Sequence, residues 1–415
     1  MEKTNRFNNT TSERTSKLEM VLEASKAIHS VLEKSIECIG AERGTIYLAD
    51  HDNETFWSKV HTGDRRISIT LPMGTGVAGH VVKTGKTINV KNVKKDSRFY
   101  GEIDDLTGFE TKNMLCMPLK NRYGEILGAL QLLNKKHDSF FLAEDEEFIE
   151  AFSIHAAIAI EKARLYEVEK QKTDLEKELF AAGEVQKKLF PSEIPDVNGY
   201  EFAAVNIPAA VTSGDLYDYV KLSDGKTLFS LGDVSGKGLP AAIIMANLQS
   251  LIRAYPNFNS SAAYCVKQAN KIIEKSTADG KFITLFLGIL DPINHIITYS
   301  NAGHEDPVFI ENGNISRLNE GGLPLGIFED LNYEEGQITM KPGNLLAIFS
   351  DGISDASNKK GECFTEDRLI NILTDHLHLD PNSLIELICK RIDSFVENTP
   401  QFDDITLSIV KRNEL

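Results

Sequence analysis

The sequence has little positive charge for its length and no long hydrophobic run. Its 45 lysines and arginines stand against 61 aspartates and glutamates, which gives a net charge of −16 over 415 residues. Proteins that bind nucleic acid or anionic lipid need a basic surface, so this balance argues against both classes of partner. No uncharged apolar stretch reaches the ~18 residues of a membrane span, so we expect no transmembrane helix. The polar segment 1–17 also lacks the apolar stretch of a secretory signal.

Cysteine is also scarce, and its spacing predicts no site. The five cysteines are Cys38, Cys116, Cys265, Cys363 and Cys389. Their odd number and the lack of a Cys-x-x-Cys pair argue against a disulfide framework and against a zinc site. This usage is typical of a reducing compartment, so we expect a cytoplasmic protein. At roughly 100–200 residues per domain, the length predicts two or three domains.

An α+β domain is predicted for residues 18–150, after a disordered N-terminus at 1–17. Residues Leu18–Ile39 carry apolar side chains at helical spacing. Short β-branched or alternating runs follow at 44–49, 67–71, 87–90, 114–119 and 126–133, separated by Gly, Asn, Asp and Pro. Such runs predict a mostly antiparallel sheet flanked by helices.

A long helix is predicted between Glu147 and Phe190, because this stretch contains neither proline nor a glycine cluster. Apolar residues at 3-4 spacing along it are Leu165, Val168, Leu175, Leu179, Ala182 and Leu189, with Lys172 and Gln186 at seam positions. This pattern favours a parallel coiled coil over the linker 151–190, which would join two copies in a homodimer. The alternative is a single amphipathic helix that lies on its own domain.

Residues 191–415 are predicted to form a second domain with aspartates at its strand ends. Strand-like runs occur at 227–231, 282–290, 345–350 and 405–410, and helical segments at 240–255, 262–276 and 381–397. Aspartates stand beside glycine or at run ends at Asp215, Asp233, Asp351 and Asp403–Asp404. Taken singly, an Asp-Gly pair is an ordinary turn. Converging carboxylates, however, would form an all-oxygen site for two Mg²⁺ or Mn²⁺ ions able to activate water and hold a phosphoryl group.

An ordered set of motifs covers residues 180–412. It comprises Ala181–Pro191, Gly214–Asp218, Gly232–Ala242, Met245–Gln249, Ser300–His304, Pro324–Ile327, Lys341–Asn344, Ser350–Asp355 and Asp403–Thr406. This set resembles the SpoIIE/RsbU-type serine phosphatases, a branch of the metal-dependent PPM family. The resemblance implies an αββα sandwich and the hydrolysis of phosphoserine or phosphothreonine by a metal-bound hydroxide. It also implies a STAS-type anti-anti-sigma factor as the substrate.

The resemblance assigns a role to each carboxylate. Asp233 would bridge two metal ions, Asp351 and Asp403 would complete one site, and Asp215 with the Val234 carbonyl would complete the other. Asp403 is chosen over its neighbour Asp404 by analogy alone.

Other residues of this domain are expected to be structural, or depart from the family pattern. Asn301 and His304 are expected to have structural roles. The family's usual Val-Gly-Gly-Asp is replaced by Thr212–Asp215, and Phe364-Thr365 stands where Phe-Gly is common. Neither change removes a metal carboxylate, which argues against the alternative of a signalling scaffold with little turnover.

Residues 18–165 carry motifs of a second kind. These are Leu71–Gly79, Asp96–Phe99, Asp105–Pro118 and Gly128–Lys135, and together they resemble a GAF domain. Asn134-Lys135, then Phe141, then Asp145-Glu146 resemble the signature of cyclic-nucleotide-binding GAF domains. In that family the Lys135–Asp145 pair would be a salt bridge that supports the pocket.

The segment with Thr107 and Thr111 would close over the ligand in such a domain. We therefore expect a cyclic nucleotide, with cAMP favoured, to bind here and to change the phosphatase rate through the long helix. Another small ligand, or a purely structural GAF domain, is the alternative.

Overall fold

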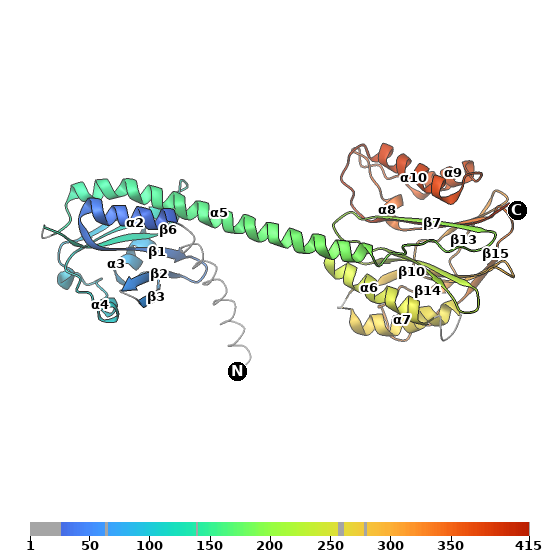
Figure 1. Ribbon diagram of the computed structural model, residues 1–415, viewed down its shortest axis with the longest axis horizontal. Helices are drawn as coiled ribbons and strands as arrows, with labels where there is room; N and C mark the ends of the chain where they lie inside the picture. The colour runs from blue at the N-terminus through green and yellow to red at the C-terminus, as the bar shows by residue number, and fades with distance from the viewer. Residues whose placement is uncertain (1–25, 63–64, 138–139, 256–260, 278–279, 415) are drawn as a thin grey trace. The chain divides into compact units, whose positions relative to one another are not determined.

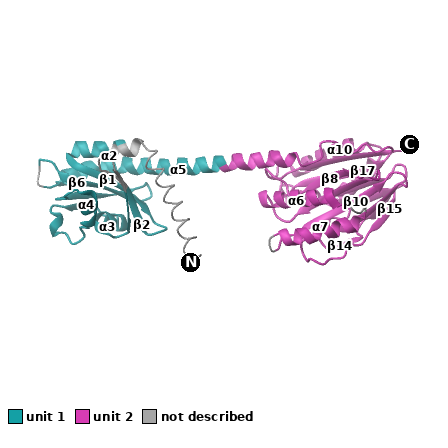
Figure 2. Cartoon of the chain, turned by 60° about the horizontal axis from the view of Figure 1, so that its bottom comes forward, with its two compact units in different colours: residues 1–174 teal, residues 175–415 magenta. Residues whose placement is uncertain are grey.

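The computed structural model describes residues 26–62, 65–137, 140–255, 261–277 and 280–414. The chain forms two compact units, Met1–Asp174 and Leu175–Leu415, called here the first and second unit (Figure 2). Residues 18–25 of the first predicted helix lie outside the described residues. Among the helices that the structure describes, none combines the length and the apolar character that crossing a membrane requires.

A six-stranded antiparallel sheet forms the centre of the first unit, in the order β3-β2-β1-β6-β5-β4. The strands are β1 (Ala41–Asp50), β2 (Thr55–Thr62), β3 (Arg65–Pro72), β4 (Ile88–Val90), β5 (Met114–Lys120) and β6 (Ile126–Lys135). Helices α2 (Lys26–Ile39) and α5 (Ala143–Lys187) cover one face, while α3 (Gly76–Thr84), η1 (Val93–Lys95) and α4 (Glu102–Thr107) lie on the other (Figure 1). Leu132 of β6 packs with the first group and Leu133 with the second, so this strand is apolar on both faces.

Two sheets with mostly antiparallel strands form the second unit. Their strand orders are β14-β11-β10-β9-β8 and β13-β12-β16-β17-β7, and β15 pairs with β11. The strands are β7 (Tyr200–Ile207), β8 (Leu216–Lys221), β9 (Thr227–Val234), β10 (Ile283–Asp291), β11 (Ile296–Ala302), β12 (Val308–Glu311), β13 (Asn314–Arg317), β14 (Gly321–Gly322), β15 (Gly336–Thr339), β16 (Leu345–Phe349) and β17 (Ile405–Arg412). Phe229 and Phe286 of one sheet pack against Leu346 and Ile348 of the other, and these contacts form the central core.

Helices cover the outer face of each of these sheets. Helices α6 (Leu239–Ala254) and α7 (Ala262–Ser276) pack on the first sheet, and α8 (Asp351–Ser354), α9 (Glu366–Asp375) and α10 (Pro381–Val396) pack on the second. The order of layers is helix, sheet, sheet, helix, which confirms the predicted αββα sandwich and the α+β class.

Helix α5 confirms the long helix predicted from the sequence, although it begins at Ala143 and ends at Lys187. Leu165, Val168 and Leu175 are 65%, 65% and 57% exposed, so their apolar side chains are available to a partner. The two-chain coiled coil stays a prediction. Gln186, placed on the seam by its spacing, is instead 6% exposed and buried within the second unit, where its amide finds a backbone partner.

Candidate metal centre and ligand pocket

The antiparallel pairing of the strands brings the four predicted ligand aspartates to one end of the sandwich. Asp215 precedes β8, and Asp233 lies near the end of β9, which pairs antiparallel with β8. In the other sheet, Asp351 follows β16 and Asp403 precedes β17, and these two strands are also antiparallel neighbours. Since the end of one strand adjoins the start of its antiparallel partner, each sheet delivers two carboxylates to the same edge.

Burial and neighbouring carboxylates raise the pKa values of Asp215, Asp233 and Asp351. Burial, and then the charge of Asp233, raise the pKa of Asp215 well above its usual range. Burial and the charge of Asp351 raise the pKa of Asp233 to about 6. Burial and the charge of Asp403 raise the pKa of Asp351. The negative charges at this edge therefore repel one another. Divalent cations that prefer oxygen ligands would relieve this repulsion.

Protein groups hold two of these carboxylates in the structure. The Thr406 hydroxyl donates to Asp215, and the Lys237 ammonium lies 3.1 Å from a carboxylate oxygen of Asp403. Within the described residues, no three His, Cys, Asp or Glu side chains already stand together as a ready ligand group. The donor chemistry fits Mn²⁺ or Mg²⁺, and binding would require Asp403 to exchange its lysine partner for metal.

Asp403 and Asp404 have different surroundings. One oxygen of Asp404 accepts from the Ala209 amide at 2.7 Å, and the other accepts from the Ser213 hydroxyl at 2.8 Å and the Gly214 amide at 2.7 Å. Asp404 thus ties the loop before β8 to the start of β17. The Asp403 side chain is 35% exposed, and its partners are the Lys237 ammonium and the Asp404 amide, so it makes fewer hydrogen bonds than Asp404 and is open to solvent.

Two glycines allow the backbone to close around the carboxylates. A Cβ on Gly214 would lie 3.1 Å from the Val234 carbonyl oxygen, which places that predicted ligand beside the residue preceding Asp215. A Cβ on Gly352 would lie 2.0 Å from the carbonyl oxygen of Asp404. Any side chain at position 352 would therefore push apart the two loops of the second sheet that carry Asp351 and Asp403.

Asn301 and His304 brace the turn after β11. The Asn301 side chain accepts from the His304 amide at 2.8 Å and donates to the Leu318 carbonyl at 3.1 Å. His304 is 5% exposed, and its Nδ1 lies 2.9 Å from the Thr284 hydroxyl. Burial lowers the pKa of His304 to about 4, so its ring is neutral at physiological pH.

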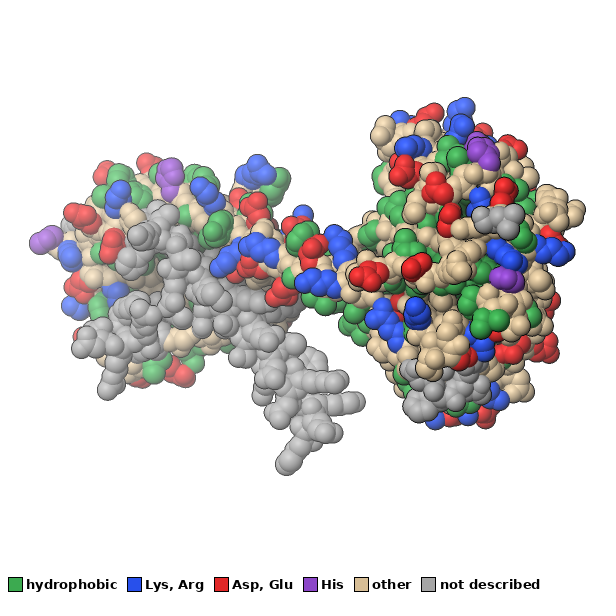
Figure 3. All heavy atoms as spheres, turned by 45° about the vertical axis from the view of Figure 1, so that its right-hand side comes forward, with side chains coloured by type: hydrophobic (Ala, Val, Ile, Leu, Met, Phe, Trp, Pro, Cys, Tyr) green, Lys and Arg blue, Asp and Glu red, His purple; other side chains and the backbone are tan. Residues whose placement is uncertain are grey.

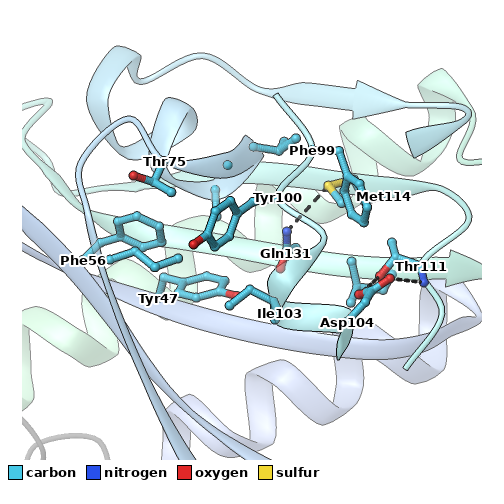
Figure 4. Close-up of a pocket in the computed structure, with 15 residues that line it drawn as sticks. Tyr47, Phe56, Thr75, Phe99, Tyr100, Ile103, Asp104, Thr111, Met114 and Gln131 are labelled. Atoms are coloured by element: carbon cyan, nitrogen blue, oxygen red, sulfur yellow. Dashed lines mark hydrogen bonds between the residues drawn. The ribbon is translucent and has the colours of Figure 1, made fainter. Parts of the chain in front are cut away.

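A small pocket opens in the first unit between the sheet and α4. Tyr47, Tyr100, Asp104, Thr111 and Gln131 line it (Figure 4). The Thr111 hydroxyl and amide both donate to the Asp104 carboxylate, each at 2.7 Å. The cavity holds about 50 Å³, far below the roughly 300 Å³ at which small-molecule pockets begin. A nucleotide therefore requires the segment that carries Tyr100 and Asp104 to move away from the sheet.

Of the predicted sensor residues, Thr111 lines this pocket, and Asn134, Lys135, Phe141 and Asp145 lie outside its lining. Lys135 and Asp145 form an ion pair at 2.7 Å, and Phe141 is fully buried. The Asn134 side chain accepts from the Lys112 amide at 2.7 Å. This hydrogen bond holds the backbone next to Thr111, just before β5. Thr107 lines a smaller adjoining cavity with Gln131. Tyr47 and Gln131 could not be recognised as pocket residues from the sequence, because there they show only the alternation of an ordinary strand.

Comparison with known proteins assigns both units. Residues 223–413 match the family model of stage II sporulation protein E (SpoIIE), and residues 23–160 match that of the GAF domain. The chain joins a GAF domain to a SpoIIE-family domain of the PPM phosphatase type. The SpoIIE match contains Asp233, Asp351 and Asp403, and it begins after Asp215.

Relatives of several kinds are similar to this chain. Protein IcfG of Synechocystis is 29% identical over 57% of this chain, and phosphoserine phosphatase RsbU of Bacillus subtilis is 27% identical over 58%. The aligned part spans 42% of the length of IcfG and 71% of that of RsbU. A dual cyclic-AMP and cyclic-GMP phosphodiesterase 11A of Takifugu rubripes is 32% identical over 37% of this chain and 18% of its own length.

One solved structure supports the fold of the second unit. The SiaA-PP2C domain of Pseudomonas aeruginosa has a TM-score of 0.52 and 18% identity, and covers 59% of this chain and 98% of its own. At this identity the likeness concerns the fold alone.

Proposed function

We propose that the SpoIIE domain is a metal-dependent protein serine/threonine phosphatase. The observation that carries the proposal is the meeting of Asp215, Asp233, Asp351 and Asp403 at one edge of the sandwich, each of the first three with a raised pKa. Asp233 would bind both of two Mn²⁺ or Mg²⁺ ions. Asp351 and Asp403 would bind one of these ions, and Asp215 with the Val234 carbonyl would bind the other. When bound, the ions supply the positive charge that activates water and stabilises the phosphoryl group.

Hydrolysis of p-nitrophenyl phosphate and of a phosphoserine peptide, with and without Mn²⁺, tests this function. We expect a rate that EDTA abolishes, and we expect Asp233→Asn to lose it while the circular dichroism spectrum is kept. Full activity in EDTA would refute the two-metal site. A wild-type protein without turnover would favour the alternative, a signalling scaffold that binds its partner without hydrolysis.

The proposed substrate is a phosphoserine on a STAS-type anti-anti-sigma factor. Support comes from the likeness to the phosphoserine phosphatase RsbU. Incubation with a phosphorylated STAS protein, followed by intact-mass measurement, would detect the loss of one phosphate. A substrate that keeps its phosphate while p-nitrophenyl phosphate is hydrolysed would contradict only this choice of partner.

The proposed ligand of the GAF domain is a cyclic nucleotide, cAMP before cGMP. Support comes from the buried Phe141, the Lys135–Asp145 ion pair and the likeness to cyclic-nucleotide phosphodiesterases. Calorimetry with both nucleotides tests the proposal on the full chain. Absence of binding at millimolar concentration would leave another small ligand or a structural GAF domain as the role of this unit.

The proposed assembly is a homodimer through α5. Support comes from the exposed Leu165, Val168 and Leu175 along its middle. Two charges in place of Leu165 and Leu175 would be buried in such a seam, which costs several kcal/mol. Sedimentation of the wild type as a dimer and of the doubly charged variant as a monomer is expected, and a monomeric wild type at micromolar concentration would contradict the assembly.

A further inference from the structure

A groove beside the candidate metal centre has no role in the chemistry described so far. It lies between the segment after α8, the end of α10 and the loop before β17, and its volume is about 450 Å³. This is within the roughly 300–1,000 Å³ of ligand-binding pockets. Asp403, a proposed metal ligand, lies in its wall, so the groove is continuous with the place where a phosphoryl group would bind.

Both apolar and acidic side chains line the groove. Ile392 and Val396 of α10 contribute apolar surface. Asp355 and Asp393 stand on the walls, both exposed, and neither carboxylate makes an ion pair with any residue that the structure describes. Phe402 is 78% exposed beside them, with the Lys237 ammonium over its ring. A surface with these features complements a chain segment that carries an apolar and a basic side chain.

The loop after α10 lines the groove. Glu397 and Asn398 have φ values of 51° and 66°. Glu397 caps the end of α10, where the left-handed conformation is common, and asparagine adopts this conformation readily. The Thr399 hydroxyl, in the groove wall, is buried and has no hydrogen-bond partner in the described structure. Because its oxygen is closed off from solvent, this hydroxyl contributes no hydrogen-bonding group to the open groove.

We propose that this groove binds the part of the phosphoprotein that flanks the phosphoserine and selects a lysine or arginine there through Asp355 and Asp393. The inference rests on the proposed phosphatase function and adds the substrate preference. Acidic and basic side chains are interspersed over the face of the second unit seen in Figure 3. With the net charge of −16, the protein would also attract basic segments over a longer range.

The test compares phosphoserine peptides that differ only in the residues flanking the phosphoserine, lysine in one and glutamate in the other. With Mn²⁺ present, we expect the wild-type kcat/KM for the lysine peptide to exceed that for the glutamate peptide at least tenfold. Asp393→Lys should lower this ratio at least tenfold, chiefly through KM, because it replaces an attractive charge by a repulsive one. It should also improve hydrolysis of the glutamate peptide, an effect that misfolding cannot produce.

Asp367→Lys is the matched control. Asp367 is exposed on α9, makes no ion pair within the described part of the chain, and lies outside the groove, yet the variant has the same change in net charge. We expect it to keep the wild-type peptide ratio.

Three results would overturn the inference. Equal changes in the Asp393 and Asp367 variants would mean that general charge, rather than the groove, sets the preference. Equal hydrolysis of both peptides by the wild type would refute the groove while leaving the phosphatase in place. Failure to hydrolyse either peptide or p-nitrophenyl phosphate would end both proposals.

Discussion

Thr365 occupies a backbone conformation that essentially only glycine adopts. At the start of α9 its φ is 68° and its ψ is 150°. A β-branched residue in this region costs about 1–3 kcal/mol. The sequence already marked position 365 as a departure, because many SpoIIE-type chains have glycine there. The structure gives that departure a physical meaning, namely strain next to the loop after α8.

Thr365→Gly should therefore raise the free energy of unfolding of the second unit by about 1–2 kcal/mol. Thr365→Ala is the control, since it removes the branched side chain but leaves a Cβ in the same backbone conformation. Urea denaturation of the full chain, with hydrogen exchange in residues 366–375 to locate the change, measures both variants. An equal gain in the alanine variant would show that the side chain, and not the backbone, was strained.

Substitution by asparagine should have different main effects at the neighbours Asp403 and Asp404, on Mn²⁺ binding at the first and on stability at the second. Asp403→Asn removes charge from a repulsive cluster and loses one exposed ion pair worth at most about 1 kcal/mol, so stability should be nearly unchanged. Binding of Mn²⁺ should weaken at least tenfold, which spin resonance of free Mn²⁺ measures directly.

Asp404→Asn puts an amide group where three donors meet a carboxylate, and it should lower stability by about 1–3 kcal/mol. Its Mn²⁺ affinity should fall less than that of the Asp403 variant. The reverse pattern, with Mn²⁺ lost chiefly in Asp404→Asn, would move the ligand assignment to the second aspartate.

At the scale of elements, the end of α5 is bonded to the candidate metal centre. The Gln186 side chain donates to the Ser213 carbonyl at 2.7 Å and accepts from the Ser213 amide at 2.9 Å. The Ser213 hydroxyl in turn bonds to Asp404 and to the amide of Asp215. A displacement of the end of this helix would therefore shift the loop that carries a proposed metal ligand.

Gln186→Glu should make stability depend on pH in a defined direction. A protonated glutamate can donate and accept as glutamine does, whereas the carboxylate faces the Ser213 carbonyl without a proton to donate. Burial would raise the folded-state pKa of this glutamate above the ~4.3 of the unfolded chain. The stabilising bond is therefore present below pH ~4.3 and is lost as the pH rises through the folded-state pKa.

Urea denaturation of wild type and variant between pH 4 and 8 measures this effect. The difference in the free energy of unfolding should grow with pH. Gln186→Leu, which leaves both Ser213 groups unpaired, should be destabilised about equally at every pH. A pH-independent Glu variant would show that solvent reaches the Gln186 site.

Helices and strands with a clear apolar pattern could be predicted from the sequence. Strands that are recognised mainly by their hydrogen bonds to other strands could not. Helix α7 spans 262–276 as predicted, and β16 and β17 begin at the predicted residues. Strands β2, β7, β8 and β11–β15 were missed. Strands β13 and β14 carry few apolar residues, and β7 pairs with β17, a strand far along the chain.

The same division holds for the sites. Asp233 and Asp351 follow predicted strands and Asp403 precedes one, whereas Asp215 was identified only through the ordered set of motifs that resembles the SpoIIE/RsbU-type phosphatases. The Asp404 bonds to the loop before β8, the lysine partner of Asp403 and the groove beside α10 depend on tertiary contacts that no local pattern encodes.

At the scale of the whole molecule, α5 is the continuous element that belongs to both units. It runs from Ala143, beside the Lys135–Asp145 ion pair, to Lys187, next to the Gln186 contact with Ser213. We therefore expect a ligand that alters the start of this helix to influence the candidate metal centre by rotating or shifting the end of the helix. The ligand can change the rate only by its differential affinity for two states, typically about 5–150-fold.

Insertions into α5 at the boundary between Asp174 and Leu175 test this route by geometry. Each added residue rotates the helix by about 100°, so two residues turn its end by about 200° and seven return it to within about 20° of its original phase. Both insertions, made of Glu, Ala and Lys, should keep nucleotide binding and metal-dependent hydrolysis of p-nitrophenyl phosphate. The seven-residue insertion should keep the response of the rate to cAMP, and the two-residue insertion should lose it. A response that survives both insertions, or a wild-type rate that stays flat with nucleotide bound, would contradict transmission through the phase of the helix.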